Sequence, residues 1–252
     1  MGIRKPTLEE WFLAHQLRKM SEGRVYVPVM LELDVTAIAE RYRDRDARPP
    51  WTAILAKALA LTAVKVPEVN RAYVRTLFGD RIIEFSHVSV NVPFVVEEEG
   101  RAHLGVTTIR GVDRLTVTEI SHAIGTAKRK SVDKLNLTRL VVRKNNNVFW
   151  RTLLRIFLFV AFNLPSQIEK RGGGLALTSL LNPKDGGVLS RAAAPGPTAI
   201  TTALSDVRRR DDGTTVMQVG LGIDHAALSG FAARRFGDVL YETLTEEPAA
   251  FD

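Results

Sequence analysis

The chain has 252 residues, of which 45% are hydrophobic and 25% charged, and 35 basic against 28 acidic residues give a net charge of +7. This composition is typical of a folded globular protein and argues against wholesale disorder. Because there is no cysteine, the sequence excludes a disulfide framework, a cysteine nucleophile and thiolate metal sites, and it is compatible with a reducing cytosol.

Local signals predict helices and strands along the whole chain. Thr7 and Thr116 are expected to cap helices, and Glu119 completes a capping box with Thr116. The predicted helices are Leu8–Met20, Trp51–Val66, Thr116–Lys130, Val148–Leu164 and a last one from about Gly230 to Thr245. The predicted strands are Val25–Asp34, Arg81–Phe85, Val88–Val96, Leu104–Ile109, Leu175–Leu180, Thr198–Val207 and Thr215–Ile223. We therefore expect an α/β (α+β) fold with a large mixed sheet and one domain over residues 1–252, with a turn at Glu97–Gly100 and a hairpin around Asp212-Gly213.

The basic residues are spread along the chain rather than gathered on one motif. Short clusters such as Lys128–Lys130 are not interleaved with aromatic residues, as a base-stacking platform would be. We expect solvated basic surfaces and no nucleic-acid partner, although such a surface attracts small anions. No secretory signal is recognised at the start, so a cytoplasmic location is expected.

The stretch Val148–Leu164 is intensely apolar but contains Arg151 and Arg155. A membrane span needs about 20 apolar residues with few charges, so a span is not expected. The favoured interpretation is a buried or interface-packed helix. The alternative is a membrane-surface helix whose two arginines face the headgroups.

Most of the five histidines have structural explanations. His15 and His122 fall within helix patterns and His103 beside a turn, so we expect surface or structural roles. His87 begins an apolar strand and is expected to be partly buried. No pattern of metal ligands is present, nor a phosphate loop, a dinucleotide fingerprint or a serine elbow.

His225 differs, because it follows a strand and precedes a helix. A side chain at such a position is fixed by the sheet and still reaches a cleft, which makes His225 a candidate catalytic residue.

Several segments, in order, resemble the catalytic domain of the dihydrolipoamide acyltransferases of 2-oxoacid dehydrogenase complexes, which share the chloramphenicol acetyltransferase-like fold. The similar segments include a first strand that ends in D-V-T and a K-A-[LV]-A helix followed by P-E-[LV]-N. They also include a strand ending I-R, an F-T-[IL]-[ST]-N strand and a D-H-R-x-x-D-G loop. In this sequence they are Val27–Thr36, Ile54–Ala60 with Pro67–Asn70, Val88–Val92 paired with Val106–Arg110, Leu175–Ser179 and Asp224–Gly230.

The resemblance implies a direct acyl transfer from a thioester, with coenzyme A thioester as the co-substrate and no covalently bound cofactor. His225 would be the general base and Thr178 the hydroxyl that stabilises the oxyanion. Asp224, Gly230 and Arg110 match supporting motif positions, and Ser179 stands where the family has asparagine. The family builds this site across a trimer interface, so a homotrimer or a multiple of it is implied.

The sequence departs from the family pattern at several positions. Ala226 replaces the arginine after the histidine, and Ser229 replaces an aspartate that orients the loop through an arginine. Gly111 replaces an aspartate next to Arg110, with Asp113 keeping a carboxylate nearby. The turn at Leu180–Gly187 is unusual, the helix at 148–164 is an apparent insertion, and no lipoyl or subunit-binding domain is recognised. The alternative function is therefore an inactive homologue that acts as an oligomeric scaffold or ligand-binding module.

Overall fold

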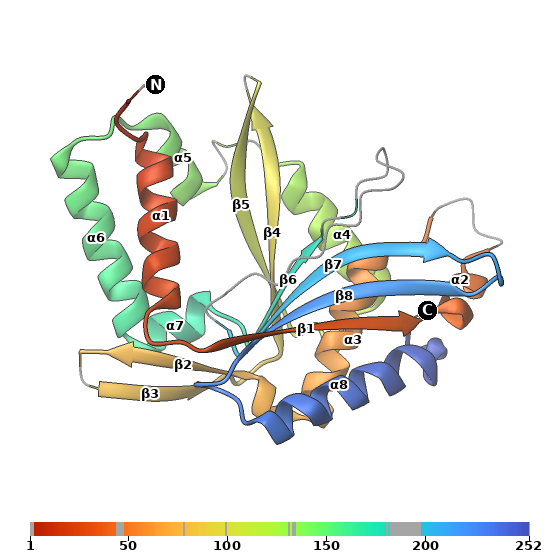
Figure 1. Cartoon of the computed structure of the whole chain (residues 1–252). Helices are drawn as coiled ribbons and strands as arrows, with labels where there is room; N and C mark the ends of the chain where they lie inside the picture. The colour runs from red at the N-terminus through yellow and green to blue at the C-terminus, as the bar shows by residue number, and fades with distance from the viewer. Residues whose placement is uncertain are drawn as a thin grey trace.

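The computed structural model describes residues 3–43, 48–77, 79–98, 100–130, 132, 135–179, 181 and 198–251. Its main sheet has six strands in the order β1-β8-β7-β6-β4-β5 (Figure 1). Strand β6 runs parallel to β4 and β7, and the other neighbours are antiparallel, so the mixed sheet expected from the sequence is confirmed. The strands are β1 Tyr26–Asp34, β4 Ser89–Glu98, β5 Arg101–Arg110, β6 Leu175–Ser179, β7 Ile200–Arg209 and β8 Thr215–Asp224.

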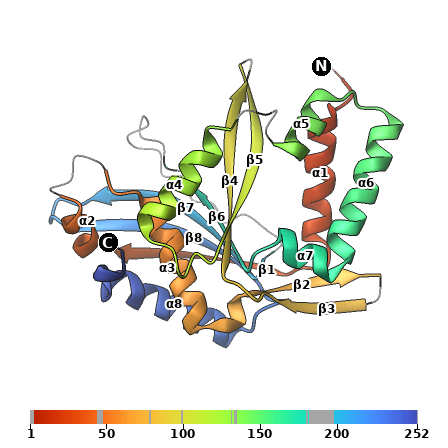
Figure 2. The same cartoon turned by 180° about the vertical axis from the view of Figure 1, so that it is seen from behind.

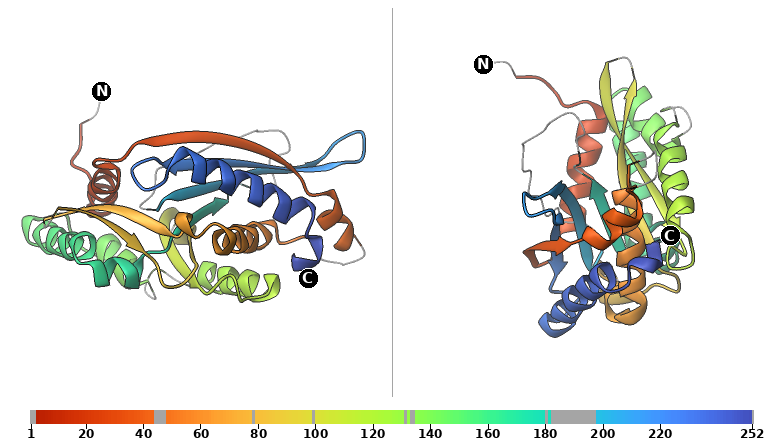
Figure 3. Two further views of the ribbon diagram at one scale, coloured as in Figure 1. Left: turned by 90° about the horizontal axis from the view of Figure 1, so that it is seen from below. Right: turned by 90° about the vertical axis from the view of Figure 1, so that its right-hand side faces the viewer.

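Four helices contact the strands of this sheet. They are α2 Thr36–Arg41, α3 Trp51–Lys65, α4 Val117–Lys128 and α8 Gly230–Thr245. Figure 3 shows α3 and α8 lying side by side along one face. Alternate residues of β8 join the core with these helices, among them Val219 and Leu221. Because side chains alternate along a strand, Gln218 and Gly220 point to the opposite face.

A second group of helices lies beside the far end of the sheet. It consists of α1 Leu8–Ser21, α5 Asn136–Arg143, α6 Val148–Asn163 and α7 Pro165–Arg171. Helices α1 and α6 lie side by side (Figures 1 and 2). They share a cluster in which Phe12, Leu154 and Leu158 are buried. The hairpin of β2 Arg71–Thr76 and β3 Gly79–Glu84 forms a separate two-stranded sheet, and 3-10 turns lie at Pro67–Val69 and Pro248–Phe251.

Elements with clear local signals match the predictions closely. Thr7 and Thr116 both form complete capping boxes, and the last helix has the predicted bounds. The local sequence patterns did not predict α2, β2, α5 or α7. The turn expected at Glu97–Gly100 is shorter in the structure, because β4 and β5 remain paired as far as Glu98 and Arg101. Apart from Leu181, the unusual turn at Leu180–Gly187 lies outside the described residues.

Candidate active site

His225 occupies the first position after β8 and is exposed. Its backbone N–H donates to the carbonyl of Val25 at 2.8 Å, which fixes the start of the loop against the segment leading into β1. Its ring Nδ1 lies 3.1 Å from the carbonyl oxygen of Leu228. A carbonyl only accepts hydrogen bonds, so this contact requires the proton on Nδ1. A neutral His225 ring then carries its free lone pair on Nε2, as a general base requires.

The residue before the histidine forms a buried ion pair. Asp224 and Arg24 have side-chain exposures of 0% and 7%, and their Oδ2 and Nη1 atoms are 2.7 Å apart. Arg24 also donates to the carbonyl of Tyr73 at 2.7 Å, while Oδ1 of Asp224 accepts the backbone N–H of Ala226 at 3.0 Å. The carboxylate therefore ties the loop after β8 to the chain before β1.

A second arginine holds the other side of the loop, since Nε of Arg71 donates to the carbonyl of Ala227 at 2.7 Å. Ser229, where the family has an aspartate, is the N-cap of α8 and its hydroxyl accepts the N–H of Ala232. Gly230 begins α8, and a β-carbon there would lie 3.7 Å from Cε1 of His225. The loop is thus held by Arg24 and Arg71, which the sequence analysis did not identify because their partners lie far along the chain.

Thr178 lies on β6, at some distance from His225. It is opposite Ala203 of β7, which is opposite Gly220 of β8. His225 follows Gly220 by five residues, so the two side chains are offset by about 16 Å along the strands and by two strand spacings, about 10 Å, across them. One chain therefore does not bring His225 and Thr178 together. Ser179, the next residue, alternates to the face that carries Leu177.

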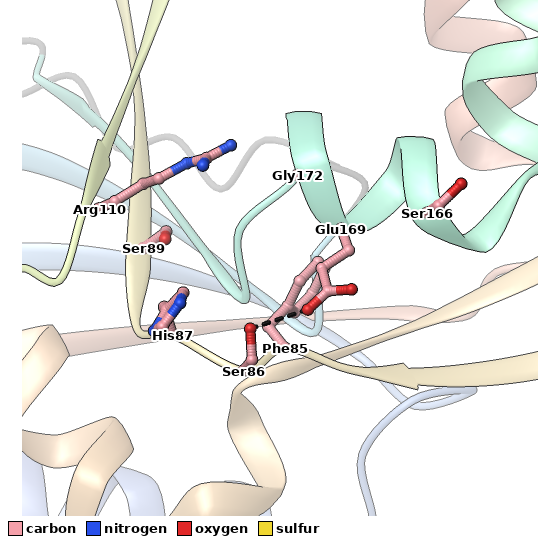
Figure 4. Close-up of a pocket in the computed structure, with 8 residues that line it drawn as sticks. All are labelled: Phe85, Ser86, His87, Ser89, Arg110, Ser166, Glu169 and Gly172. Carbon is pink, nitrogen blue, oxygen red and sulfur yellow. Dashed lines mark hydrogen bonds between the residues drawn. The ribbon is translucent and has the colours of Figure 1, made fainter.

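Arg110, at the end of β5, lines a pocket of about 270 Å³ together with Ser89, Glu169 and His87 (Figure 4). The hydroxyl of Ser86 donates to Glu169 at 2.8 Å across its floor. His87 is exposed, so the prediction that it is partly buried was wrong; it precedes β4 and does not enter the strand's buried row.

The chain after Arg110 explains one departure from the family pattern. Gly111 has a φ of +62°, a left-handed conformation that side chains other than glycine rarely adopt, so an aspartate would be strained there. Nearby, Nζ of Lys57 donates to the carbonyl of Asp113 at 2.7 Å. Burial lowers the pKa of Lys57, and the negative charges of Asp113 and Glu119 partly oppose this shift.

Among the described residues, no group of three or more histidine, aspartate or glutamate side chains is placed to hold a metal ion.

No protein-family model and no curated protein sequence matches the chain. Among solved structures, the catalytic core of a 2-oxoacid dehydrogenase complex from Thermoplasma acidophilum gives a TM-score of 0.66 at 20% identity, over 98% of this chain and 99% of that one. The chain has the fold of these acyltransferase cores.

Two further structures agree. Dihydrolipoamide acetyltransferase of Azotobacter vinelandii gives a TM-score of 0.64 at 18% identity, and the cubic core of a pyruvate dehydrogenase complex gives 0.63 at 16%, each over 99% of this chain and 93% of that one. In the Azotobacter enzyme, a serine, a histidine and an asparagine four residues after the histidine have been investigated for their role in the catalytic mechanism. At these identities the likeness establishes an acyltransferase-like fold, as the sequence resemblance implied.

Proposed function

We propose that the protein is an acyltransferase that moves an acyl group directly from a thioester, coenzyme A thioester being the expected donor, to a small acceptor. The observation that carries the proposal is His225: it stands exposed at the end of β8, with Nδ1 bound to a carbonyl and Nε2 left as a base. The acyltransferase-like fold supports the same conclusion.

In the proposed reaction, Nε2 of His225 takes the proton from the acceptor's thiol, hydroxyl or amine as that group attacks the thioester carbon. The carbonyl oxygen becomes an oxyanion, to which the hydroxyl of Thr178 donates a hydrogen bond. Collapse of this intermediate breaks the carbon–sulfur bond, and the protonated histidine returns its proton to the departing thiolate. The chain has no cysteine, so no enzyme thioester intervenes.

The offset between His225 and Thr178 leads us to propose that the site forms between subunits, with the histidine from one chain and the threonine from its neighbour. A closed ring of identical subunits, such as a trimer, repeats such a head-to-tail contact at every interface. Ser229 follows His225 by four residues, which is the spacing between the histidine and the asparagine investigated in the Azotobacter enzyme.

The test measures thiol release from a panel of acyl-coenzyme A thioesters in the presence of thiol, amine and alcohol acceptors. His225→Ala should lower the rate by about 10²- to 10⁴-fold, because the general base is lost. His122→Ala, which changes an exposed histidine on α4, is the matched control and should leave the rate unchanged. Equal rates in the wild type and His225→Ala would refute the assignment.

The alternative is an inactive oligomeric scaffold, motivated by Ala226 and Ser229. The contacts of Arg24 with Asp224 and of Arg71 with Ala227 weigh against a scaffold. They hold the histidine loop in place although the family's arginine and aspartate are replaced in this chain. Absence of turnover with every thioester and acceptor, in a chain that still assembles, would favour the scaffold.

A further inference from the structure

Helix α6 carries a row of exposed apolar side chains that nothing in the proposed reaction uses. Phe149, Leu153, Ile156 and Phe159 are 67%, 41%, 56% and 50% exposed. Their spacing of four, three and three residues places them on one side of the helix, and we call this row the α6 stripe. The buried Leu154 and Leu158 are on the side toward α1, so the stripe faces away from the protein.

The segment of the chain that carries the stripe contains bases and no acids. Between Lys134 and Ile168 the sequence contains no aspartate or glutamate but has six basic residues, which are Lys134, Arg139, Arg143, Lys144, Arg151 and Arg155. Lys144 follows the last residue of α5, and its Nζ lies 5.2 Å from the centre of the Trp150 ring on α6.

Arg151 and Arg155 mark the border between α6 and α1. Their guanidinium groups lie 5.4 and 5.6 Å from the centre of the Trp11 ring. The alternative interpretation from the sequence, a membrane-surface helix, has both arginines facing the headgroups. In the structure they stack on Trp11 beside the stripe, and Arg155 remains exposed there.

The helix does not have the dimensions of a membrane span. Its 16 residues measure about 24 Å along the axis, less than the roughly 30 Å of a bilayer's apolar core. In the described parts of the chain, no helix has the length and apolar character needed to cross a membrane. An apolar row bordered by bases is instead the pattern of a helix that lies in the plane of the interface.

We propose that the α6 stripe docks on an anionic lipid bilayer, with Phe149, Ile156 and Phe159 among the acyl chains and Lys144 and Arg155 near the headgroups. The basic residues beside the stripe favour an anionic bilayer over a second copy of the chain. Two copies that met through this face would bring their positive charges together. This inference is independent of the proposed reaction.

The first experiment is flotation of the full chain with vesicles of phosphatidylcholine alone or with about one third phosphatidylglycerol. The wild type should float with the anionic vesicles, and about 1 M salt should weaken this binding because it screens the headgroup charge. The triple variant Phe149→Ser/Ile156→Ser/Phe159→Ser should bind at least tenfold less, by roughly the loss of three buried apolar side chains. Phe231→Ser, which changes an 80% exposed phenylalanine on α8, is the matched control and should bind as the wild type does.

The second experiment uses the unaltered chain, so that it does not depend on how the triple variant folds. Trp150 packs edge-on against Phe149 with ring centres 5.2 Å apart. Lipids brominated on the acyl chains should therefore quench tryptophan fluorescence when the protein binds.

Three results would overturn the proposal. They are no flotation of the wild type with anionic vesicles, equal flotation of a folded triple variant, and flotation without quenching by brominated lipids. Light scattering tests whether a second copy of the chain covers the stripe instead. A triple variant with a lower oligomeric mass and unchanged flotation would assign the stripe to contacts between copies. The lipid proposal would then fail.

Discussion

A mixture of two inactive variants gives the sharpest test of how the site is assembled. His225→Ala removes the base and Thr178→Val removes the hydroxyl, so each variant alone should be inactive in the thiol-release assay. Loss of an oxyanion donor of this kind lowers turnover by about 10²- to 10³-fold. If the site forms between chains, oligomers that contain both variants should regain activity at some of their interfaces.

The expected recovery follows from the strand register. Thr178 is level with Gly220, while His225 follows Gly220 by five residues, just past the end of β8, so the roughly 16 Å offset prevents one chain from completing a site. In a random one-to-one mixture within a closed ring, half of the interfaces receive an intact histidine. Half of those also receive an intact threonine from the neighbour, which predicts about one quarter of wild-type activity in the unsorted mixture. In trimers selected to contain both variants, one of the three interfaces is intact, which predicts about one third.

The two variants should be co-expressed with different affinity tags and the mixed oligomers purified through both tags in turn. The control is the double variant His225→Ala/Thr178→Val, co-expressed in both tagged forms. It should show no recovery of activity. Activity of mixed oligomers at the level of the separate variants, with oligomer formation confirmed by light scattering, would refute the shared-site reasoning.

Three further outcomes are expected. Arg24→Met leaves the buried carboxylate of Asp224 without its partner and should lower the free energy of unfolding by about 3–5 kcal/mol in urea melts, whereas adding Asp224→Asn should recover part of the loss. Ser229→Ala removes the cap of α8 and should cost about 1 kcal/mol, while Ser229→Asp should preserve stability; equal melting points for the two would contradict a capping role. Hydrogen bonds from the Arg4 guanidinium and from the backbone of Thr7 lower the pKa of Glu10 to about 2, so the N-terminal turn of α1 should be stabilised above about pH 4.5 and lose this contribution as pH falls toward 2. NMR titration of the Glu10 side chain checks this, and a midpoint near 4.5 would contradict it.

Elements whose signals lie within a few residues could be predicted from the sequence. Thr7 and Thr116 each have a glutamate three residues later, and these capping boxes gave the correct starts of α1 and α4. The apolar run at Val148 gave α6 to within one residue of its end. Such signals act through contacts between near neighbours, which sequence order preserves.

The missed elements depend on contacts between distant residues. Strand β2 buries only Ala72 and Val74, and they pack with Ile168 of α7, about a hundred residues away. Helix α5 has no side-chain cap, and its Val141 packs into the cluster of α1 and α6. At the candidate site, the motif indicated His225 but no local pattern indicated Arg24, because its partner Asp224 is 200 residues away.

The ion pair between Arg24 and Asp224 also bears on the order of folding. Loop closure across 200 residues is entropically costly, and β1 and β8, which pair beside it, come from opposite ends of the chain. The histidine loop therefore reaches its final geometry only after almost all of the described chain has been synthesised and its two ends have met. The candidate base His225, whose backbone N–H binds the carbonyl of Val25, therefore becomes ordered only once the strands from the two ends of the chain have paired.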